Sequence, residues 1–257
     1  MRFVTICLIG ILLTFSSLLA AVEKQPVMGA GPSTAIATLF FEHFSKIDAA
    51  QGYRFVVEQR SIKHAGGIKA SGKYLFGRTG RPLNQKEKAM DKHDLFLGQI
   101  PLAIVVGSKT GVTSINLEQL ERILTGKISN WKQVGGVDHA IALAGRESTE
   151  AAFSVLKKRY SFFREAEFDQ VFKRDHQLVN FLGSSKGAYA IGFGARSNFE
   201  RGNVLTVEGF EAGVSLGFVY DQSNAEHPLV KAAISFAKSD AWKETLKDTE
   251  FLPPGDD

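Results

Sequence analysis

Apolar positions follow two spacings along this chain, one typical of buried strands and the other of helices. Residues 100–106 form an uninterrupted apolar run, which predicts a strand covered on both faces of a sheet. Between residues 33 and 47 the apolar positions recur at helical spacing, which predicts an amphipathic helix. Strands and helices of these kinds alternate through most of the sequence, and this alternation favours an α/β fold.

The same two patterns predict the remaining elements. Strands are expected at 54–59, 73–77, 141–144, 188–193 and 216–220. Helices are expected at 84–92, 117–124 (capped by Asn116), 149–160, 162–172, 176–182 and 228–238, with a short helix opening at 66–69 and a frayed tail from 252. No repeat, low-complexity tract or Pro/Ser-rich linker interrupts this order. Two lobes without a linker would be joined by strands, as in receptors that bend at a hinge.

Residues 1–21 are expected to be a secretory signal peptide. A short positive start precedes an almost wholly apolar run over 3–20, and small residues end the segment. An uncleaved membrane anchor stays open as the alternative, because about 18 apolar residues can just span a bilayer. The single cysteine, Cys7, lies in this segment without a lipobox before it. We therefore expect neither lipidation nor disulfides. A chain without disulfides suits a bacterial periplasm.

The rest of the chain is long enough for two lobes of roughly 110–120 residues, each with its own core. We place lobe 1 at residues 22–102 and 214–257, and lobe 2 at 103–213. The net charge is +4 and no run of five basic residues occurs. The sequence therefore does not predict a nucleic-acid surface.

Three segments place glycine, hydroxyl or arginine residues where a helix is predicted to begin. They are residues 29–34 (GAGPST), 77–83 (GRTGRPL) and 145–149 (GREST). The start of a helix carries unpaired N–H groups and the positive end of the helix dipole, so each segment suits part of an anion. Together they predict a receptor for a small oxyanion.

Five motifs in order resemble the phosphate-binding periplasmic receptors of ABC transporters, the PstS-like group of type 2 periplasmic binding proteins. Segment 29–34 is similar to the opening glycine turn of that family, and 61–69 to its second anion loop. Segment 76–83 resembles the loop that ends in Pro-Leu, and 124–131 the Gly-Lys-Ile-x-x-Trp turn. Segment 146–149 looks like a shortened Arg-rich Ser-Gly-Thr loop.

The resemblance implies a two-lobed α/β receptor with its ligand in a cleft at a hinge. It would bind inorganic phosphate or a similar oxyanion as a monomer and deliver it to an ABC permease. It would carry out no catalysis and need no cofactor or metal. The ligand-binding residues are expected to be Ser33, Thr34, His64, Arg78, Arg146, Ser148 and Thr149. Several are needed, because a charge-assisted hydrogen bond contributes about 1.5–3 kcal/mol whereas micromolar affinity requires about 8 kcal/mol.

The chain departs from the family pattern at three places. Gly80 stands where the family often has an Asp that accepts the proton of hydrogen phosphate, and His64 where it usually has a serine. The third loop is shorter. Because sulfate carries no proton and a buried acceptor repels it, we expect this chain to reject sulfate less strictly. Glu147 could supply an acceptor from lobe 2 instead.

Plainer roles for these residues also stay open. Ser33, Ser148 and Thr149 could simply cap helices. Arg146 could form a salt bridge, and Arg78 and Arg81 could lie either in the cleft or in solvated loops. His64 could be an ordinary surface residue. Trp131 is interpreted as a packing residue.

The sequence gives weaker support for other functions. Segment 183–187 matches Gly-x-Ser-x-Gly, but a helix is predicted before it and a strand after it, the reverse of a hydrolase elbow. The group Asp91-x-His93-Asp94 is interpreted as solvated surface rather than a metal site. A receptor fold serving as a sensory or interaction subunit without a transporter is the alternative function, because fold does not fix function.

Overall fold

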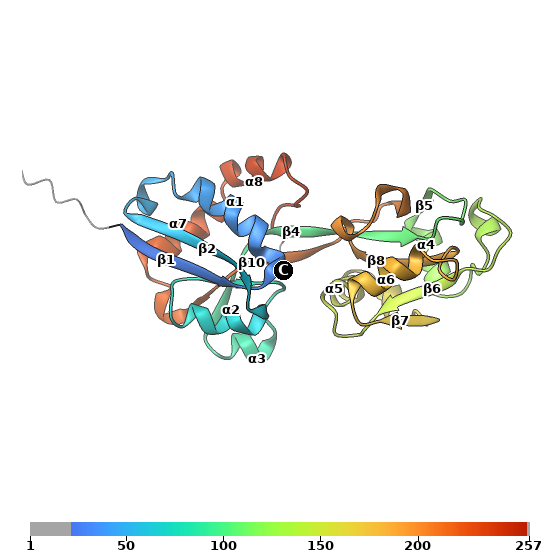
Figure 1. Ribbon diagram of the computed structural model, residues 1–257, viewed down its shortest axis with the longest axis horizontal. Coiled ribbons are helices and arrows are strands. Elements are labelled where there is room, and N and C mark those ends of the chain that lie inside the picture. Colours follow the sequence, from blue (N-terminus) through green and yellow to red (C-terminus); the bar gives the residue numbers. More distant parts are fainter. Residues whose placement is uncertain (1–21, 256–257) are drawn as a thin grey trace, which may run out of the picture.

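The computed structural model describes residues 22–255, which form two lobes joined by long strands (Figure 1). One lobe holds elements from both ends of the described chain: β1 (Glu23–Gly29), α1 (Thr34–Phe44), β2 (Tyr53–Ser61), α2 (Lys63–Ser71), β3 (Gly77–Thr79), α3 (Gln85–Lys88), α7 (Pro228–Ala237) and α8 (Asp240–Lys247). We call it the first lobe. The predicted signal peptide lies outside the described residues.

The second lobe is formed by the middle of the chain. Its elements are β5 (Ser114–Asn116), α4 (Leu117–Leu124), β6 (Ala142–Arg146), α5 (Ala151–Arg159), β7 (Gln170–Phe172), α6 (Asp175–Leu182), β8 (Ala190–Ala195) and β9 (Val204–Glu208). The α/β architecture predicted from the sequence is confirmed. The lobe boundaries at residues 102 and 214 stay a prediction.

Strand β4 (Lys92–Val106) belongs to both lobes. Its first part, as far as Pro101, pairs antiparallel with β10 (Gly213–Asp221), and its last part, from Leu102, pairs antiparallel with β8. The strand order β2-β1-β3-β10-β4-β8-β6-β7 therefore runs from one lobe into the other. At the crossing, the N–H of Leu102 donates to the carbonyl of Ala212 over 2.8 Å. The lobes are thus joined by strands, as the lack of a linker predicts.

Each lobe has a hydrophobic core of its own. In the first lobe, Phe40 lies 5.2 to 5.5 Å, centroid to centroid, from five aromatic rings: Phe41, Phe44, Phe218, Phe236 and Trp242. In the second lobe, Phe193 contacts Phe153 and Phe163, with Trp131 in the same cluster. Each core buries several large side chains, and full burial of one such side chain stabilises by about 1.5–3 kcal/mol. The lobes can therefore be stable bodies that move relative to each other.

Several local predictions are confirmed. Asn116 caps α4, because its side chain accepts the N–H of Gln119 while the Gln119 side chain accepts the N–H of Asn116. Trp131 is fully buried and its indole N–H donates to the carbonyl of Tyr189 over 2.7 Å, so it is a packing residue. Segment 183–187 follows α6 and precedes β8, the order that excludes a hydrolase elbow.

Other predictions are wrong, and backbone contacts explain why. The helix expected at 162–172 is a 3-10 turn, Ser161–Arg164, followed by β7, which pairs with β6. The strand expected at 73–77 begins only at Gly77, because the N–H groups of Lys73 and Tyr74 both bond the carbonyl of Ala70 and close the end of α2.

The remaining errors concern element ends and missed elements. The charged helix expected at 84–92 ends at Lys88, since Asp91 has a left-handed backbone and Lys92 begins β4. The short helix expected to open at 66–69 begins at Lys63. Helix α8 and the strands β1, β5 and β9 were not predicted. The tail is not frayed at Leu252, which exchanges two hydrogen bonds of 2.9 and 3.0 Å with the backbone of Gln99.

Residues 22–255 contain neither a helix suited to span a membrane nor a cluster of metal-ligating side chains. None of the helices within residues 22–255 is long and apolar enough to cross a membrane. Over the same residues, no group of three or more His, Cys, Asp or Glu side chains is arranged to hold a metal ion, and the Asp91-x-His93-Asp94 segment is no exception.

Candidate anion-binding site

The glycine turn at the start of α1 is held by close backbone packing. Gly29 ends β1 with φ at 148°, and a Cβ there would lie 2.1 Å from the backbone oxygen of Arg78. Only glycine fits this position. The N–H of Gly31 donates to Ser61 Oγ over 3.1 Å, and the N–H of Ile62 donates to the Gly29 carbonyl over 3.0 Å. The end of β2 therefore fixes the positive end of α1 in place.

Arg78 lies fully buried directly behind this turn. Its Nε donates to the carbonyl of Val27 over 3.2 Å, and its two terminal nitrogens donate to the carbonyls of Ala30 over 2.9 Å and of Glu58 over 2.5 Å. It also donates to the hydroxyl of Thr34. The guanidinium thus joins β1, the turn, β2 and the first residue of α1.

All four of these acceptors are neutral, so they leave the charge of Arg78 uncompensated. Among residues 22–255, no carboxylate lies within salt-bridge distance of it. Burial lowers the pKa of Arg78 and the more distant carboxylate of Glu58 raises it, but an arginine stays protonated at any physiological pH. The start of α1 therefore has a fixed positive charge beneath it, in addition to the helix dipole.

The hydroxyls of Ser33 and Thr34 make different hydrogen bonds. Ser33 is buried and donates its proton to the carbonyl of Ala30 over 3.1 Å, and it makes no capping bond to the helix backbone. Thr34 is half-buried and its oxygen accepts from Arg78, so its own proton must point elsewhere. Of these two predicted ligands, Thr34 has the hydroxyl that is set to donate to an anion.

Gly80 faces the same turn. A Cβ at position 80 would lie 3.2 Å from the Cβ of Ala30 and 3.7 Å from the ring of Pro32. A longer side chain at this position would therefore point at the start of α1. This placement fits the interpretation that Gly80 stands where related receptors have their proton acceptor.

His64 and Arg81 are both engaged with Glu87. Two nitrogens of Arg81 donate to the two carboxylate oxygens of Glu87 over 2.8 and 2.9 Å, and His64 Nε2 lies 3.3 Å from the same carboxylate. These contacts lower the pKa of Glu87 to about 2. Burial, followed by Arg81, lowers the pKa of His64, so its ring is neutral at pH 7. His64 links α2 to α3 through Glu87 and carries no charge for an anion.

Arg146, at the end of β6, has an acidic partner. It is 4% exposed and forms an ion pair with Asp175, the first residue of α6. Its Nε donates to the carbonyl of Phe172 over 3.1 Å. The structure therefore shows the salt bridge that the sequence left open, and the Arg146 guanidinium is committed to the second lobe.

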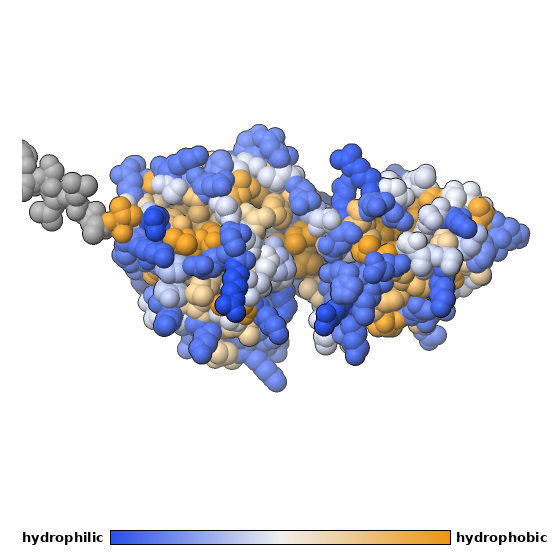
Figure 2. All heavy atoms as spheres, in the orientation of Figure 1, coloured by the Kyte–Doolittle hydropathy of each residue, from blue (hydrophilic) through white to orange (hydrophobic). Residues whose placement is uncertain are grey.

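Ser148 and Thr149 are exposed between β6 and α5. Neither caps the helix, because the cap of α5 is Glu150, whose carboxylate accepts the N–H of Phe153 over 2.9 Å. Both line a cavity of about 620 Å³ between the lobes, with Arg81 on its other wall. Figure 2 shows this region as a notch between the lobes with mostly hydrophilic borders.

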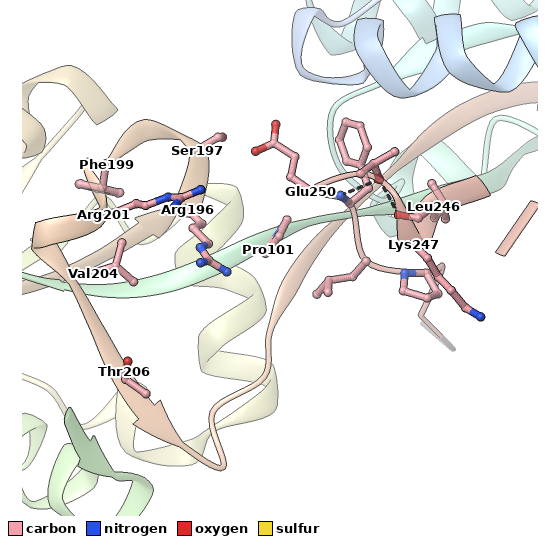
Figure 3. A pocket seen from close by; sticks show the side chains of 14 residues that line it. Pro101, Arg196, Ser197, Phe199, Arg201, Val204, Thr206, Leu246, Lys247 and Glu250 are labelled. Carbon is pink, nitrogen blue, oxygen red and sulfur yellow. Dashed lines mark hydrogen bonds between the residues drawn. The ribbon is translucent and has the colours of Figure 1, made fainter. Parts of the chain in front are cut away.

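Two further cavities lie between the lobes. One of about 310 Å³ is lined by Pro32 and Ala35 at the start of α1 and by Asp175 across the gap. The other, of about 1000 Å³, lies beside Pro101 and brings Arg196 and Arg201 of the second lobe opposite Glu250 of the first (Figure 3). The structure thus groups Thr34 with Arg78 in the first lobe and Ser148 with Thr149 in the second. Neither Thr34 nor Arg78 lines the cavity that contains Ser148 and Thr149.

Three residues of this region were not predicted. Asp175 neutralises Arg146, Glu150 caps α5, and Glu58 supplies a carbonyl to Arg78. The pairs with Arg146 and Arg78 span 29 and 20 residues, so no local pattern indicates them. By contrast, Asn84 and Glu87 form a capping box whose Asn-x-x-Glu spacing was available in the sequence.

Comparison with known proteins gives related sequences. Residues 29–244 match the family described as the PBP superfamily domain. The phosphate-binding protein PstS of Borreliella burgdorferi is 26% identical over 200 residues, which cover 72% of this chain and 71% of that protein. PstS of Bacillus subtilis is 38% identical over 71 residues, which cover 28% of this chain and 23% of that protein.

Solved structures share the fold. A candidate phosphate ABC transporter substrate-binding protein from Clostridium perfringens, with bound phosphate, has a TM-score of 0.61 at 19% identity and covers 91% of this chain and 100% of its own. An ABC-type phosphate transport receptor from Vibrio cholerae has a TM-score of 0.54 at 22% identity, covering 90% and 100%. The predicted resemblance to this group is confirmed. Because the family match spans most of its length, the chain belongs to the PBP superfamily.

Proposed function

We propose that this protein captures a small oxyanion between its two lobes, with inorganic phosphate as the first candidate, for import by an ABC transporter. The names of its relatives support this ligand. The observation that carries the proposal is Arg78, a buried arginine with only neutral acceptors directly behind the start of a helix. An anion at that helix start would complete the charge balance of the turn.

The first lobe would bind the anion before the second one closes on it. N–H groups at the start of α1, the Thr34 hydroxyl and the charge of Arg78 form one half of the site. The exposed hydroxyls of Ser148 and Thr149 form the other half. Each charge-assisted hydrogen bond contributes about 1.5–3 kcal/mol, so micromolar affinity, about 8 kcal/mol, requires donors from both lobes. No bond is made or broken.

Closure would bend the strands that join the lobes. β4 changes its partner from β10 to β8 between Pro101 and Leu102, and this step supports a hinge there. It also supports lobes of residues 22–102 with 214–257, and 103–213. We propose that the protein works as a monomer in the periplasm, exported by residues 1–21, and that its partner is an ABC permease.

Titration calorimetry of residues 22–257 with phosphate and with sulfate tests the ligand. We expect micromolar binding of phosphate, and a loss of at least tenfold in Thr34→Val, because that variant keeps the shape but removes the donor. Thr38→Val is the matched control, since its hydroxyl donates to the Thr34 carbonyl within the same helix. The absence of binding at millimolar phosphate and sulfate would contradict the proposal.

A further inference from the structure

The cavity of about 620 Å³ between the lobes has an apolar wall as well as polar groups. Four of its apolar side chains come from three elements and one loop: Leu83, Phe96, Val155 and Val214. Inorganic phosphate has no apolar surface and gains nothing from these contacts. Cavities of roughly 300–1,000 Å³ with an apolar lining and a few polar groups are typical of sites for small organic molecules.

The charged residues of this cavity are all cationic. Arg81 and Lys88 line it from the first lobe and Lys158 from the second, and no acidic residue is part of its lining. Arg81 is balanced by Glu87. Lys88 and Lys158 have no ion pair within residues 22–255. Closure would bring these two ammonium groups toward each other, which is unfavourable unless an anion lies between them.

The neighbouring cavity beside Pro101 differs in this respect. Arg196, Arg201 and Lys247 share it with Glu250, whose carboxylate extends from the first lobe toward the second (Figure 3). Closure there brings opposite charges together without a ligand. The requirement for an anion is therefore specific to the cavity that contains Ser148 and Thr149.

The lining of this cavity contains no carboxylate that could accept a proton from the ligand. Inorganic phosphate keeps at least one proton at neutral pH, and that proton needs an acceptor. A phosphate monoester has a second pKa near 6 and is largely a dianion without a proton at neutral pH. Such a ligand matches a site with fixed cations and no acceptor.

We propose that the cleft takes a phosphate monoester with a small apolar substituent. Its phosphoryl group would lie with Ser148, Thr149 and the two lysines, and its substituent against Leu83, Phe96 and Val155. This inference rests on the proposed function, because Ser148 and Thr149 serve both ligands.

Phenyl phosphate is the probe, compared with inorganic phosphate by titration calorimetry at pH 7.5. We expect phenyl phosphate to bind at least tenfold more tightly. Phe96→Ala should weaken phenyl phosphate at least fivefold and leave inorganic phosphate within twofold. Val155→Thr keeps the shape of the side chain and should weaken phenyl phosphate binding about threefold. This variant tests the apolar wall even if Phe96→Ala fails to fold.

Lysine variants test the charges. The double variant Lys88→Gln with Lys158→Gln should weaken the binding of phenyl phosphate at least fivefold. Lys86→Gln is the control, because Lys86 lies on α3 with Lys88 but outside the cavity lining, and it should have no effect. Binding of inorganic phosphate with equal or weaker binding of phenyl phosphate would overturn this inference and leave the proposed function intact. Failure of both ligands to bind would overturn both proposals.

Discussion

Two buried arginines, one in each lobe, lie close to the candidate site and are held in opposite ways. Arg78 is surrounded by three carbonyls and a hydroxyl, whereas Arg146 is paired with the carboxylate of Asp175. The residue type and its position beside a helix start are the same. Only the partner decides whether the positive charge remains available to a ligand. The comparison indicates that the first lobe keeps a buried positive charge with neutral acceptors, whereas the second lobe neutralises its own buried arginine.

The largest expected effect is on stability, in Arg78→Met compared with Arg146→Met. Arg78→Met removes the donor that bonds the carbonyls of Val27, Ala30 and Glu58. These carbonyls then lose a hydrogen bond that Arg78 makes in the buried interior. Since an unsatisfied buried acceptor costs about 1–3 kcal/mol, we expect a loss of about 3 kcal/mol or more for Arg78→Met and about 1–2 kcal/mol for Arg146→Met. Asp175, half exposed, can be solvated after the change.

Urea unfolding followed by tryptophan fluorescence can separate the lobes. Trp242 lies in the core of the first lobe and Trp131 in that of the second, and the chain has no other tryptophan. In a Trp131→Phe background the signal reports the first lobe alone, where Arg78→Met should act. Equal losses for the two arginine variants would show that their different partners do not matter.

Gly80→Asp should make the surroundings of Arg78 resemble those of Arg146. The new carboxylate would point at the turn and accept the proton of hydrogen phosphate, while repelling sulfate. A site that leaves a buried polar group unpaired discriminates strongly, and we expect the phosphate-to-sulfate affinity ratio to rise at least tenfold, or about 1.4 kcal/mol. Gly80→Asn is the control with the same shape and no charge. An unchanged ratio in Gly80→Asp would contradict the placement of position 80.

Asp175→Asn should release the charge of Arg146. Asp175 also lines the cavity of about 310 Å³ opposite Pro32, so the substitution removes a negative charge from the gap. We expect phosphate affinity at low salt to rise about threefold, with the gain lost as salt screens the charges. Asp240→Asn, an exposed residue paired with Lys243 on α8, should leave affinity unchanged. A weaker affinity in Asp175→Asn would show that Arg146 needs its partner to stay in place.

A similarly small effect is expected at the third arginine of the region, Arg81. Its contact lowers the pKa of Glu87 from 4.5 to about 2, so the ion pair stabilises the folded protein above pH 4.5 and is lost as the pH falls toward 2. Arg81 is 35% exposed, and we expect Glu87→Gln to cost only about 0.5–1 kcal/mol at pH 7. The difference in unfolding free energy from the wild type should shrink between pH 4.5 and 2. A difference that is constant over this range would exclude the ion pair as its source.

The sequence predicts those features that depend on neighbouring residues. The apolar run at 100–106 identifies the buried end of β4, and Asn116 identifies the start of α4. Glycine and hydroxyl residues correctly mark the turn before α1. The helix expected at 162–172 failed because β7 depends on pairing with β6, a contact with residues far away in the chain.

The candidate site residues were named from the sequence, but their hydrogen-bond and ion-pair partners were not. Arg78 and Arg146 were both named as candidates, yet their partners lie 20 to 51 residues away for Arg78 and 26 to 29 away for Arg146. Whether an arginine is neutralised depends on the fold that brings those partners to it. Similarly, capping by Ser148 or Thr149 is locally plausible, but Glu150 takes that role.

We propose that the lobes close around an anion held from both sides. Spin labels at Lys86→Cys and Arg159→Cys report the distance between the lobes, because α3 and α5 line the same cavity and residues 22–257 contain no native cysteine. A pair at Lys86→Cys and Lys46→Cys, both in the first lobe, is the control. Saturating phosphate should shorten the first distance and leave the second unchanged. An unchanged first distance in saturating phosphate, sulfate and phenyl phosphate would contradict closure of the lobes around an anion.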